Sequence, residues 1–259
     1  MSSRTGHRQA PRRARRSTPT TKHIIFIRHA ESLYNEAMRL SGVDPMIRDA
    51  GLTENGKRQA VGARAALSEA LESLGEGDYE PVFVVSSPLT RALHTALLAR
   101  PQAAPAIEVW PELREVISGF DDIGTPASAL RSTAIAQQAS GGSESLGALD
   151  EVWWTVPARL NRKRARDTAG QPGLEVLEMY KANKAAFVRA CEEALPARLD
   201  AIVQRCSEVP AKTIVIVAHS DLLIPLTRRL GLRDEADADP RGWEFRNAQV
   251  RVAASLRLS

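Results

Sequence analysis

The chain has 259 residues, of which 43 % are hydrophobic and 25 % are charged. This composition is that of an ordinary soluble chain with enough length for one large α/β domain, and it does not require two. No apolar run approaches the roughly 20 residues of a membrane-spanning helix, so we expect no transmembrane segment. The two cysteines, Cys191 and Cys206, are too few for a disulfide framework, and we expect an intracellular protein, cytoplasmic by default.

The first 22 residues differ from the rest in charge. They hold seven of the 35 basic residues and no Asp or Glu, so the remaining 28 basic and 31 acidic residues make the body slightly acidic. We predict a disordered basic tail over residues 1–22 and one domain over residues 23–259. A targeting segment for organelle import is the main alternative, followed by a nuclear signal or nucleic-acid arm. Because the excess positive charge belongs to the tail, the basic pI says nothing about the domain, and we do not expect the domain to bind nucleic acid.

The first predicted strand ends at a pair of chemically active residues. Residues 24–27 form a short β-branched and aromatic run, which is typical of a buried strand. Arg28 and His29 follow it directly, and ligands bind beyond the carboxyl ends of strands in open α/β sheets. An imidazole beside a guanidinium offers a nucleophile or base next to a bidentate phosphate receptor.

Two helical segments are expected between the first strand and the second. Residues 33–40 favour a short helix that ends at Ser41-Gly42. Thr53 is typical of the N-cap of a long helix, which ends near Gly75. This long helix is the crossover that makes the first two strands parallel.

The second apolar run, residues 81–85, leads to another basic side chain. Ser87 and Pro88 predict a helix start, since serine can cap a helix and proline is favoured at its first position. Arg91 then falls in the first turn, where the helix dipole and free N–H groups also attract phosphate.

The region that follows contains a fourth strand, an insertion and a long helical pattern. Residues 107–110 favour the strand, and residues 125–170 are expected to be an insertion over the site in which Trp153 and Trp154 form a core pair. A helical pattern from residue 172 to residue 206 should be kinked or divided by Pro196.

The third apolar run, residues 213–218, is followed directly by His219, and residues 245–252 favour an edge strand or a hairpin. Two histidines and two arginines thus follow strands that are expected to lie side by side in a parallel sheet. The sequence therefore predicts one phosphate-binding pocket at the carboxyl edge of that sheet.

The motifs resemble those of the histidine phosphatase superfamily, the phosphoglycerate-mutase-like phosphatases of branch 1 type. Arg28-His29-Ala30-Glu31-Ser32 with Asn35 resembles the signature Arg-His-Gly-x-Ser-x-x-Asn. Further blocks follow in the family's order, and these are Gly51-Leu52-Thr53-Glu54-Asn55-Gly56, Ser87-Pro88-Leu89-x-Arg91-Ala92, Leu113-Arg114-Glu115 and Ala218-His219-Ser220. The resemblance implies a three-layer α/β/α sandwich with a mostly parallel central sheet.

The resemblance also implies a chemistry and a set of roles. His29 is expected to accept the phosphoryl group of a phosphomonoester as phosphohistidine, which water then hydrolyses. Arg28, Arg91 and His219 would hold the phosphoryl oxygens, and Glu115 would protonate the leaving oxygen, with Glu112 as the nearby alternative for this acid.

Weaker expectations concern Ser32 and Asn35, which the resemblance suggests as hydrogen-bond donors to the phosphate. No cofactor or metal is expected, since the sequence holds no His-Glu-x-x-His motif, cysteine pair or Asp-rich loop. The expected partner is a phosphorylated small molecule or a phosphoprotein.

Three departures from the family pattern accompany these matches. Ala30 replaces the usual glycine, and Ser220-Asp221 replaces a common Gly-Gly pair, with Asp221 interpreted as a cap of the following helix. Residues 119–124 depart from a Trp-Glu-Gly signature, so the substrate of those relatives is not transferred. A phosphoglycerate mutase-type phosphotransferase and a regulator or scaffold with the phosphatase fold are the alternative functions.

Overall fold

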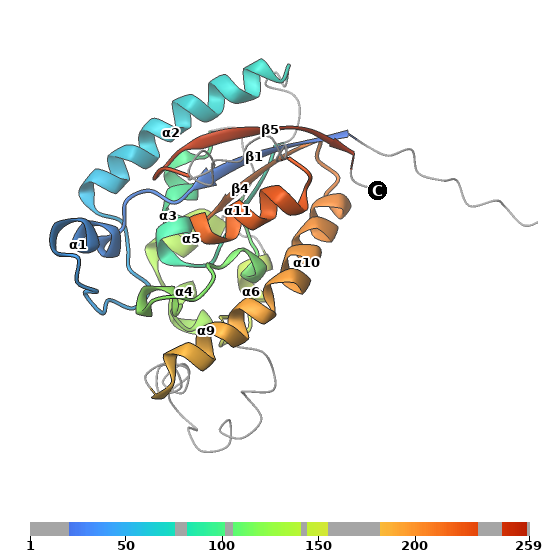
Figure 1. The fold of residues 1–259 in the computed structure, drawn as a ribbon. Coiled ribbons are helices and arrows are strands. Elements are labelled where there is room, and N and C mark those ends of the chain that lie inside the picture. Colours follow the sequence, from blue (N-terminus) through green and yellow to red (C-terminus); the bar gives the residue numbers. More distant parts are fainter. Residues whose placement is uncertain are drawn as a thin grey trace, which may run out of the picture.

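The computed structural model of the chain describes residues 21–75, 82–101, 106–140, 144–154, 182–232 and 245–257. Within them, five strands form one sheet in the order β3-β2-β4-β1-β5. The first four strands of this order are parallel, and β5 at the edge is antiparallel. Helices cover both faces of the sheet (Figure 1). The predicted α/β class with a mostly parallel central sheet is therefore confirmed.

The described elements have the following bounds. The strands are β1 Thr21–Arg28, β2 Val82–Ser86, β3 Glu108–Val109, β4 Thr213–Ala218 and β5 Val250–Arg257. The α-helices are α1 Leu33–Ser41, α2 Glu54–Ser73, α3 Thr90–Ala99, α4 Ala127–Arg131, α5 Ala134–Ser140, α6 Glu144–Gly147, α9 Lys184–Glu193, α10 Leu195–Glu208 and α11 Ser220–Arg229. Two 3-10 helices are η1 Pro111–Leu113 and η2 Phe120–Asp122.

The alternation of apolar side chains along the central strands fills both faces of the sheet. In β1, Ile25 and Ile27 point into a core that includes residues of α2 and α3, whereas Ile24 and Phe26 point into a second core with residues of α10 and α11. Successive side chains of a strand lie on opposite faces. A strand that is apolar at every position is therefore buried on both sides, as the unbroken hydrophobic runs indicated.

Several local signals have the predicted effect. Thr53 caps α2, since its side-chain oxygen accepts a hydrogen bond from the N–H of Gly56. Gly42 ends α1 in the left-handed conformation, with φ at 67°. Pro196 lies in the first turn of α10, where a missing N–H is tolerated, and so separates α9 from α10.

Three predicted boundaries are wrong, and the first is that of the edge strand, which begins at Val250 and not at residue 245. Ser87 and Pro88 do not start a helix, because α3 begins at Thr90 and has no side-chain cap of its own. Instead, the carboxylate of Asp49 accepts hydrogen bonds from the N–H and the hydroxyl of Thr90. The limit of the tail at residue 22 is also too late. β1 begins at Thr21, and buried Lys22 donates its ammonium to two backbone carbonyls beyond α10.

Trp153 and Trp154 are both buried in the main core, as predicted. The predicted tail up to residue 20, residues 155–170 of the expected insertion and the first ten residues of the expected long helical pattern lie outside the described residues. Within the described ranges, no helix combines the length and the apolar character needed to span a bilayer.

Candidate active site

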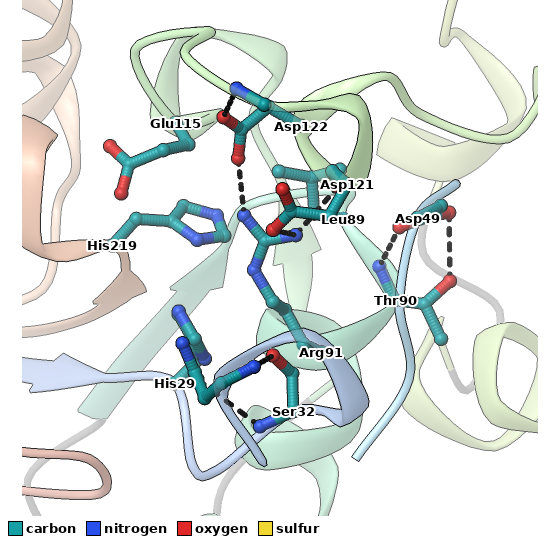
Figure 2. Close-up of polar contacts among 12 residues, drawn as sticks. His29, Ser32, Asp49, Leu89, Thr90, Arg91, Glu115, Asp121, Asp122 and His219 are labelled. Atoms are coloured by element: carbon teal, nitrogen blue, oxygen red, sulfur yellow. Dashed lines mark hydrogen bonds and ion pairs between the residues drawn. The ribbon is translucent and has the colours of Figure 1, made fainter. Parts of the chain in front are cut away.

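Five of the predicted site residues meet at the carboxyl edge of the sheet. Arg28 ends β1 and His29 follows it, His219 follows β4, Arg91 is the second residue of α3, and Glu115 lies two residues beyond η1. The rings of His29 and His219 lie 5.1 Å apart between centroids. Figure 2 shows Glu115, His219 and Arg91 grouped on one side of His29. The structure thus brings together the groups that the motif order predicted.

His29 is held in one orientation by its own loop. Its Nδ1 lies 2.8 Å from the carbonyl oxygen of Ala30, and since a carbonyl can only accept, Nδ1 carries the proton. Nε2 is therefore left with a lone pair. Burial, and then the positive charges of Arg91 and Arg28, lower the pKa of His29 well below its usual range. The imidazole is neutral at neutral pH, which is the form that a nucleophile requires.

Ala30 fits the loop without backbone strain. It is fully buried and packs in a small cluster with Leu52 and Ala60, and it is not among the residues with positive φ. Its N–H donates to the hydroxyl of Thr95 on α3. The loop therefore has room for the methyl group that replaces the family's glycine.

His219 is buried and contacts a residue that sequence reasoning had assigned to a helix start. Its Nε2 lies 2.9 Å from Oγ of Ser87, and its Nδ1 is buried with no hydrogen-bond partner in the described structure. Burial, followed by the charge of Arg91, lowers the pKa of His219 well below its usual range. An unsatisfied buried ring nitrogen beside the nucleophile is suited to an oxygen of a bound phosphoryl group.

Arg91 is 2 % exposed and is oriented by two neighbouring aspartates. Its Nη1 donates to the carbonyl of Asp121 at 2.7 Å and lies 3.4 Å from the carboxylate of the same residue. Its Nη2 donates to Asp122 at 2.7 Å, while Nε is buried without a hydrogen-bond partner among the described residues. The guanidinium is therefore held from one side, and Figure 2 shows its other side toward the two histidines.

Sequence reasoning missed the two aspartates. The only sequence feature that could have pointed to Asp121 and Asp122 is their position in residues 119–124, the segment that departs from the Trp-Glu-Gly signature. Asp122 also accepts hydrogen bonds from the N–H groups of Ser118 and Gly119 with its second oxygen. One carboxylate therefore joins the loop after Glu115 to the phosphate-binding arginine, which a reading of separate motifs does not show.

Glu115 is buried and has the proton affinity of an acid. Its carboxyl accepts hydrogen bonds from the N–H of Val116 at 2.9 Å and of Asp221 at 3.3 Å. Burial, together with the negative charges of Asp122 and Asp221, raises the pKa of Glu115 to about 8. The carboxyl is therefore protonated at neutral pH and can donate that proton.

Asp221 does not cap α11, which corrects the interpretation made from the sequence. His219 occupies the N-cap position, and Asp221 lies in the first turn, where its own N–H faces Glu115. Negative charge in a first helical turn is favoured by the helix dipole. Its effect at the site is to strengthen the proton affinity of Glu115.

Ser32 and Asn35 lie beside His29 but bond to each other. The Ser32 hydroxyl accepts from the N–H of Asn35 at 3.2 Å, and the Asn35 side chain accepts from the N–H of Ser32, which makes a capping box at α1. Asn247, in the segment where the edge strand was expected, donates to the carbonyl of His29 at 3.0 Å and lies 3.3 Å from Asn35. These contacts fix the loop that carries the nucleophile.

Arg28 is anchored at the edge of the site. Its Nη1 donates to the carbonyl of Phe245 at 2.7 Å, and its charge contributes to the lowered pKa of both histidines. No group of three or more His, Cys, Asp or Glu side chains in the described ranges is placed to hold a metal ion.

A family model and a curated relative both match part of the chain. The model of the histidine phosphatase superfamily (branch 1) matches residues 24–146. Over 98 residues the chain is 29 % identical to a glucosyl-3-phosphoglycerate phosphatase of Mycolicibacterium vanbaalenii, and this match spans 38 % of each protein.

Solved structures of similar proteins include two phosphatases. A candidate alpha-ribazole-5'-P phosphatase from Escherichia coli has 18 % identity and a TM-score of 0.47, with 91 % of this chain and 96 % of that chain covered. A mycobacterial glucosyl-3-phosphoglycerate phosphatase in complex with VO3 has 22 % identity and a TM-score of 0.41, with 92 % and 100 % covered. The family model matches the segment that carries Arg28, His29, Arg91 and Glu115, so over residues 24–146 the chain is similar to the histidine phosphatase superfamily, branch 1.

Proposed function

We propose that the protein is a phosphomonoesterase of the histidine acid phosphatase type that works through a phosphohistidine on His29. The observation that carries the proposal is the hydrogen bond from Nδ1 of His29 to the carbonyl of Ala30, which leaves the lone pair of Nε2 facing the basic groups of the site. A neutral imidazole with one nitrogen fixed as a donor is a nucleophile at the other nitrogen.

In the first step, Nε2 of His29 attacks phosphorus and the bond from phosphorus to the ester oxygen breaks. Negative charge on the phosphoryl oxygens is stabilised by Arg28, Arg91 and His219, whose buried donors need little reorganisation. Glu115 gives its proton to the departing oxygen, so that an alcohol leaves in place of an alkoxide.

In the second step, water attacks the phosphohistidine and the bond from phosphorus to Nε2 breaks. The Glu115 carboxylate takes a proton from this water, which restores the starting protonation state as inorganic phosphate leaves. The same carboxyl thus acts first as an acid and then as a base.

The two aspartates on Arg91 support this assignment. They use the Nη donors and leave Nε, which is buried and has no hydrogen-bond partner in the described structure, for a phosphoryl oxygen. An arginine held in this way loses little side-chain entropy when a phosphate binds. Ser32 and Asn35 would then act by orienting the loop of His29.

The proposed substrate is a phosphorylated small molecule, and the reaction needs no metal. The relative from Mycolicibacterium vanbaalenii bears the name of a phosphatase that acts on a glucosyl phosphoglycerate, which favours a small phosphomonoester over a phosphoprotein. A phosphatase should release inorganic phosphate from phenyl phosphate at the same rate with and without a chelator. A mutase would require a bisphosphorylated primer, and a scaffold would release no phosphate.

Trapping the intermediate tests the mechanism directly. Rapid quenching during turnover of a radiolabelled substrate should yield a phosphoenzyme that is labile in acid and stable in base, as expected for phosphohistidine. The His29→Ala variant should give no labelled protein. A phosphoenzyme that is stable in acid and labile in base would show that the nucleophile is a residue other than histidine.

A further inference from the structure

Two arginines, Arg114 and Arg198, lie next to Glu115. Arg114 precedes Glu115 in the chain, and Arg198 reaches the same segment from the second turn of α10. Nη1 of Arg198 donates to the carbonyl oxygens of Arg114 at 3.0 Å and of Glu115 at 3.2 Å. The two guanidinium groups are thus tied to the backbone that carries the proposed acid.

Neither guanidinium makes an ion pair with a carboxylate in the described part of the chain. Arg114 donates through Nη1 to the carbonyl of Pro111 at 3.2 Å, and its Nε is buried with no hydrogen-bond partner in the ranges that the structure describes. The nearby carboxylate of Glu112 is used by Arg205, at 2.8 Å. Backbone carbonyls fix the arginines in place but do not neutralise their charge.

The charges of Glu112 and Glu115 compensate the pair only in part. Burial, and then the positive charge of Arg114, lower the pKa of Arg198, and burial lowers the pKa of Arg114. A guanidinium nevertheless stays charged at neutral pH. Two partly buried like charges that bond only to backbone carbonyls repel each other, and an anion bound beside them offsets that repulsion.

The position of the pair indicates which part of a substrate would meet it. Glu115 is the group that protonates the leaving oxygen, and the charge of Arg198 acts on both Glu115 and His219. The pair therefore lies on the side of the site where the alcohol departs. The phosphoryl group itself is served by Arg28 and Arg91, so it does not account for two further arginines.

We propose that Arg114 and Arg198 form a second anion subsite, which binds a carboxylate or a second phosphate on the leaving group of the substrate. The inference rests on the proposed phosphatase function and narrows its substrates to phosphomonoesters whose alcohol carries another anionic group. Guanidinium forks match both carboxylate and phosphate in geometry.

Binding of non-hydrolysable analogues to the full chain tests the subsite without turnover. The matched pair is 4-carboxybenzylphosphonate and its neutral carboxamide, which differ in charge but hardly in shape. Calorimetry should show the carboxylate binding about 10-fold or more tightly, the size of one charge-assisted hydrogen bond. A third analogue with a second phosphonate in place of the carboxylate distinguishes the two sources of the anion.

Variants separate binding from mere positioning of Glu115. Arg198→Gln should remove most of the preference for the charged analogue while leaving the affinity for the carboxamide nearly unchanged, and Arg198→Lys should retain part of the preference. If Arg198→Gln does not fold, the same two affinities are measured with Arg114→Gln, which should also lose most of the preference for the charged analogue. The control is Arg189→Gln, which removes an exposed positive charge from α9 and should keep the full preference.

Three outcomes would decide against the subsite or against the phosphatase separately. Equal affinity of the wild-type protein for the charged and neutral analogues would overturn the subsite. An equal loss of affinity for both analogues in Arg198→Gln would show that Arg198 acts only on the position of Glu115. If the protein binds the charged analogue more tightly but hydrolyses no phosphomonoester, the anion subsite stands and the phosphatase function is overturned.

Discussion

Oγ of Ser87 lies 2.9 Å from Nε2 of His219, at the point where the neighbouring strands β2 and β4 both end. The N–H of Ser87 also donates to the carbonyl of Val217, which holds the two strand ends together. A hydroxyl proton donated to Nε2 places the imidazole proton on Nδ1, which is buried and has no hydrogen-bond partner in the described part of the chain. Ser87 would in this way set His219 as a donor to the phosphoryl group.

Ser87→Ala should therefore lower kcat/KM by about 10-fold or more, because the proton on Nδ1 is no longer favoured over the proton on Nε2. The control is Ser86→Ala, which removes an equally buried hydroxyl that bonds to a backbone carbonyl. The kcat/KM of both variants is measured by steady-state kinetics on phenyl phosphate. Unchanged kinetics in Ser87→Ala would show that the contact does not set the tautomer of His219.

His29→Ala should reduce turnover to background, a loss of about 1000-fold or more, while the fold persists. The ring lies beside that of His219 at the carboxyl edge of the sheet, so its loss removes the nucleophile and leaves the apolar side chains of both main cores in place. His94→Ala, on the same helix as Arg91, removes another partly buried imidazole and should keep the activity. Substantial residual hydrolysis by purified His29→Ala would remove His29 as the nucleophile.

Arg91→Lys should lower kcat/KM by about 100-fold or more, because an ammonium cannot reproduce the planar fork that bonds Asp121, Asp122 and phosphate together. It should also lower the melting temperature, since two buried carboxylates lose donors. Arg58→Lys, on the exposed face of α2, serves as the neutral control. Kinetics close to those of the parent would mean that Arg91 does not hold the phosphoryl group.

Activity and stability should both respond to the titration of Glu115. Its pKa is about 8 in the folded protein against 4.5 as the ordinary value, so the folded state holds this proton more tightly. The acid is competent below about pH 8, and kcat/KM should fall as the pH rises through that value. The same group contributes stability that is full below about pH 4.5 and is lost as the pH rises to about 8.

Glu115→Gln isolates the contribution of Glu115 ionisation to the pH dependence of stability, because the glutamine side chain cannot ionise. The variant should melt above the parent at about pH 9, where the parent holds a buried carboxylate, and the difference should vanish near pH 4. Thermal unfolding at both pH values measures it. A parent that is as stable as the variant at pH 9 would show that Glu115 is not desolvated as the structure indicates.

Two truncations test where the domain begins. Removal of residues 1–20 should leave the melting temperature and the rate on a small substrate unchanged, since these residues hold few apolar side chains. Removal of residues 1–22 should lower the melting temperature, because it deletes Lys22 and its two bonds to the carbonyls of Val209 and Ala211. Equal melting temperatures for the two truncations would show that Lys22 adds nothing to stability.

The sequence alone was sufficient for the elements and groups that depend on local pattern. Unbroken apolar runs predicted strands buried on both faces, and the residues that follow those runs, Arg28, His29 and His219, could be placed at one edge of the sheet because parallel strands end together. Thr53 was recognised as a cap since its partner lies three residues away. Arg91 fell in a first helical turn even though the start of that helix was misplaced by two residues.

Tertiary structure decided which groups these residues contact and in which protonation state they act. Asp122 meets Arg91, Ser87 meets His219 and Arg198 meets the backbone of Glu115 only after the sheet and its helices pack, because the partners are separated by 31 to 132 residues. The raised pKa of Glu115 depends on burial and on charges brought from two other segments, which no local pattern encodes. Local periodicity determines what lies at the edge of the sheet, whereas packing determines its chemistry.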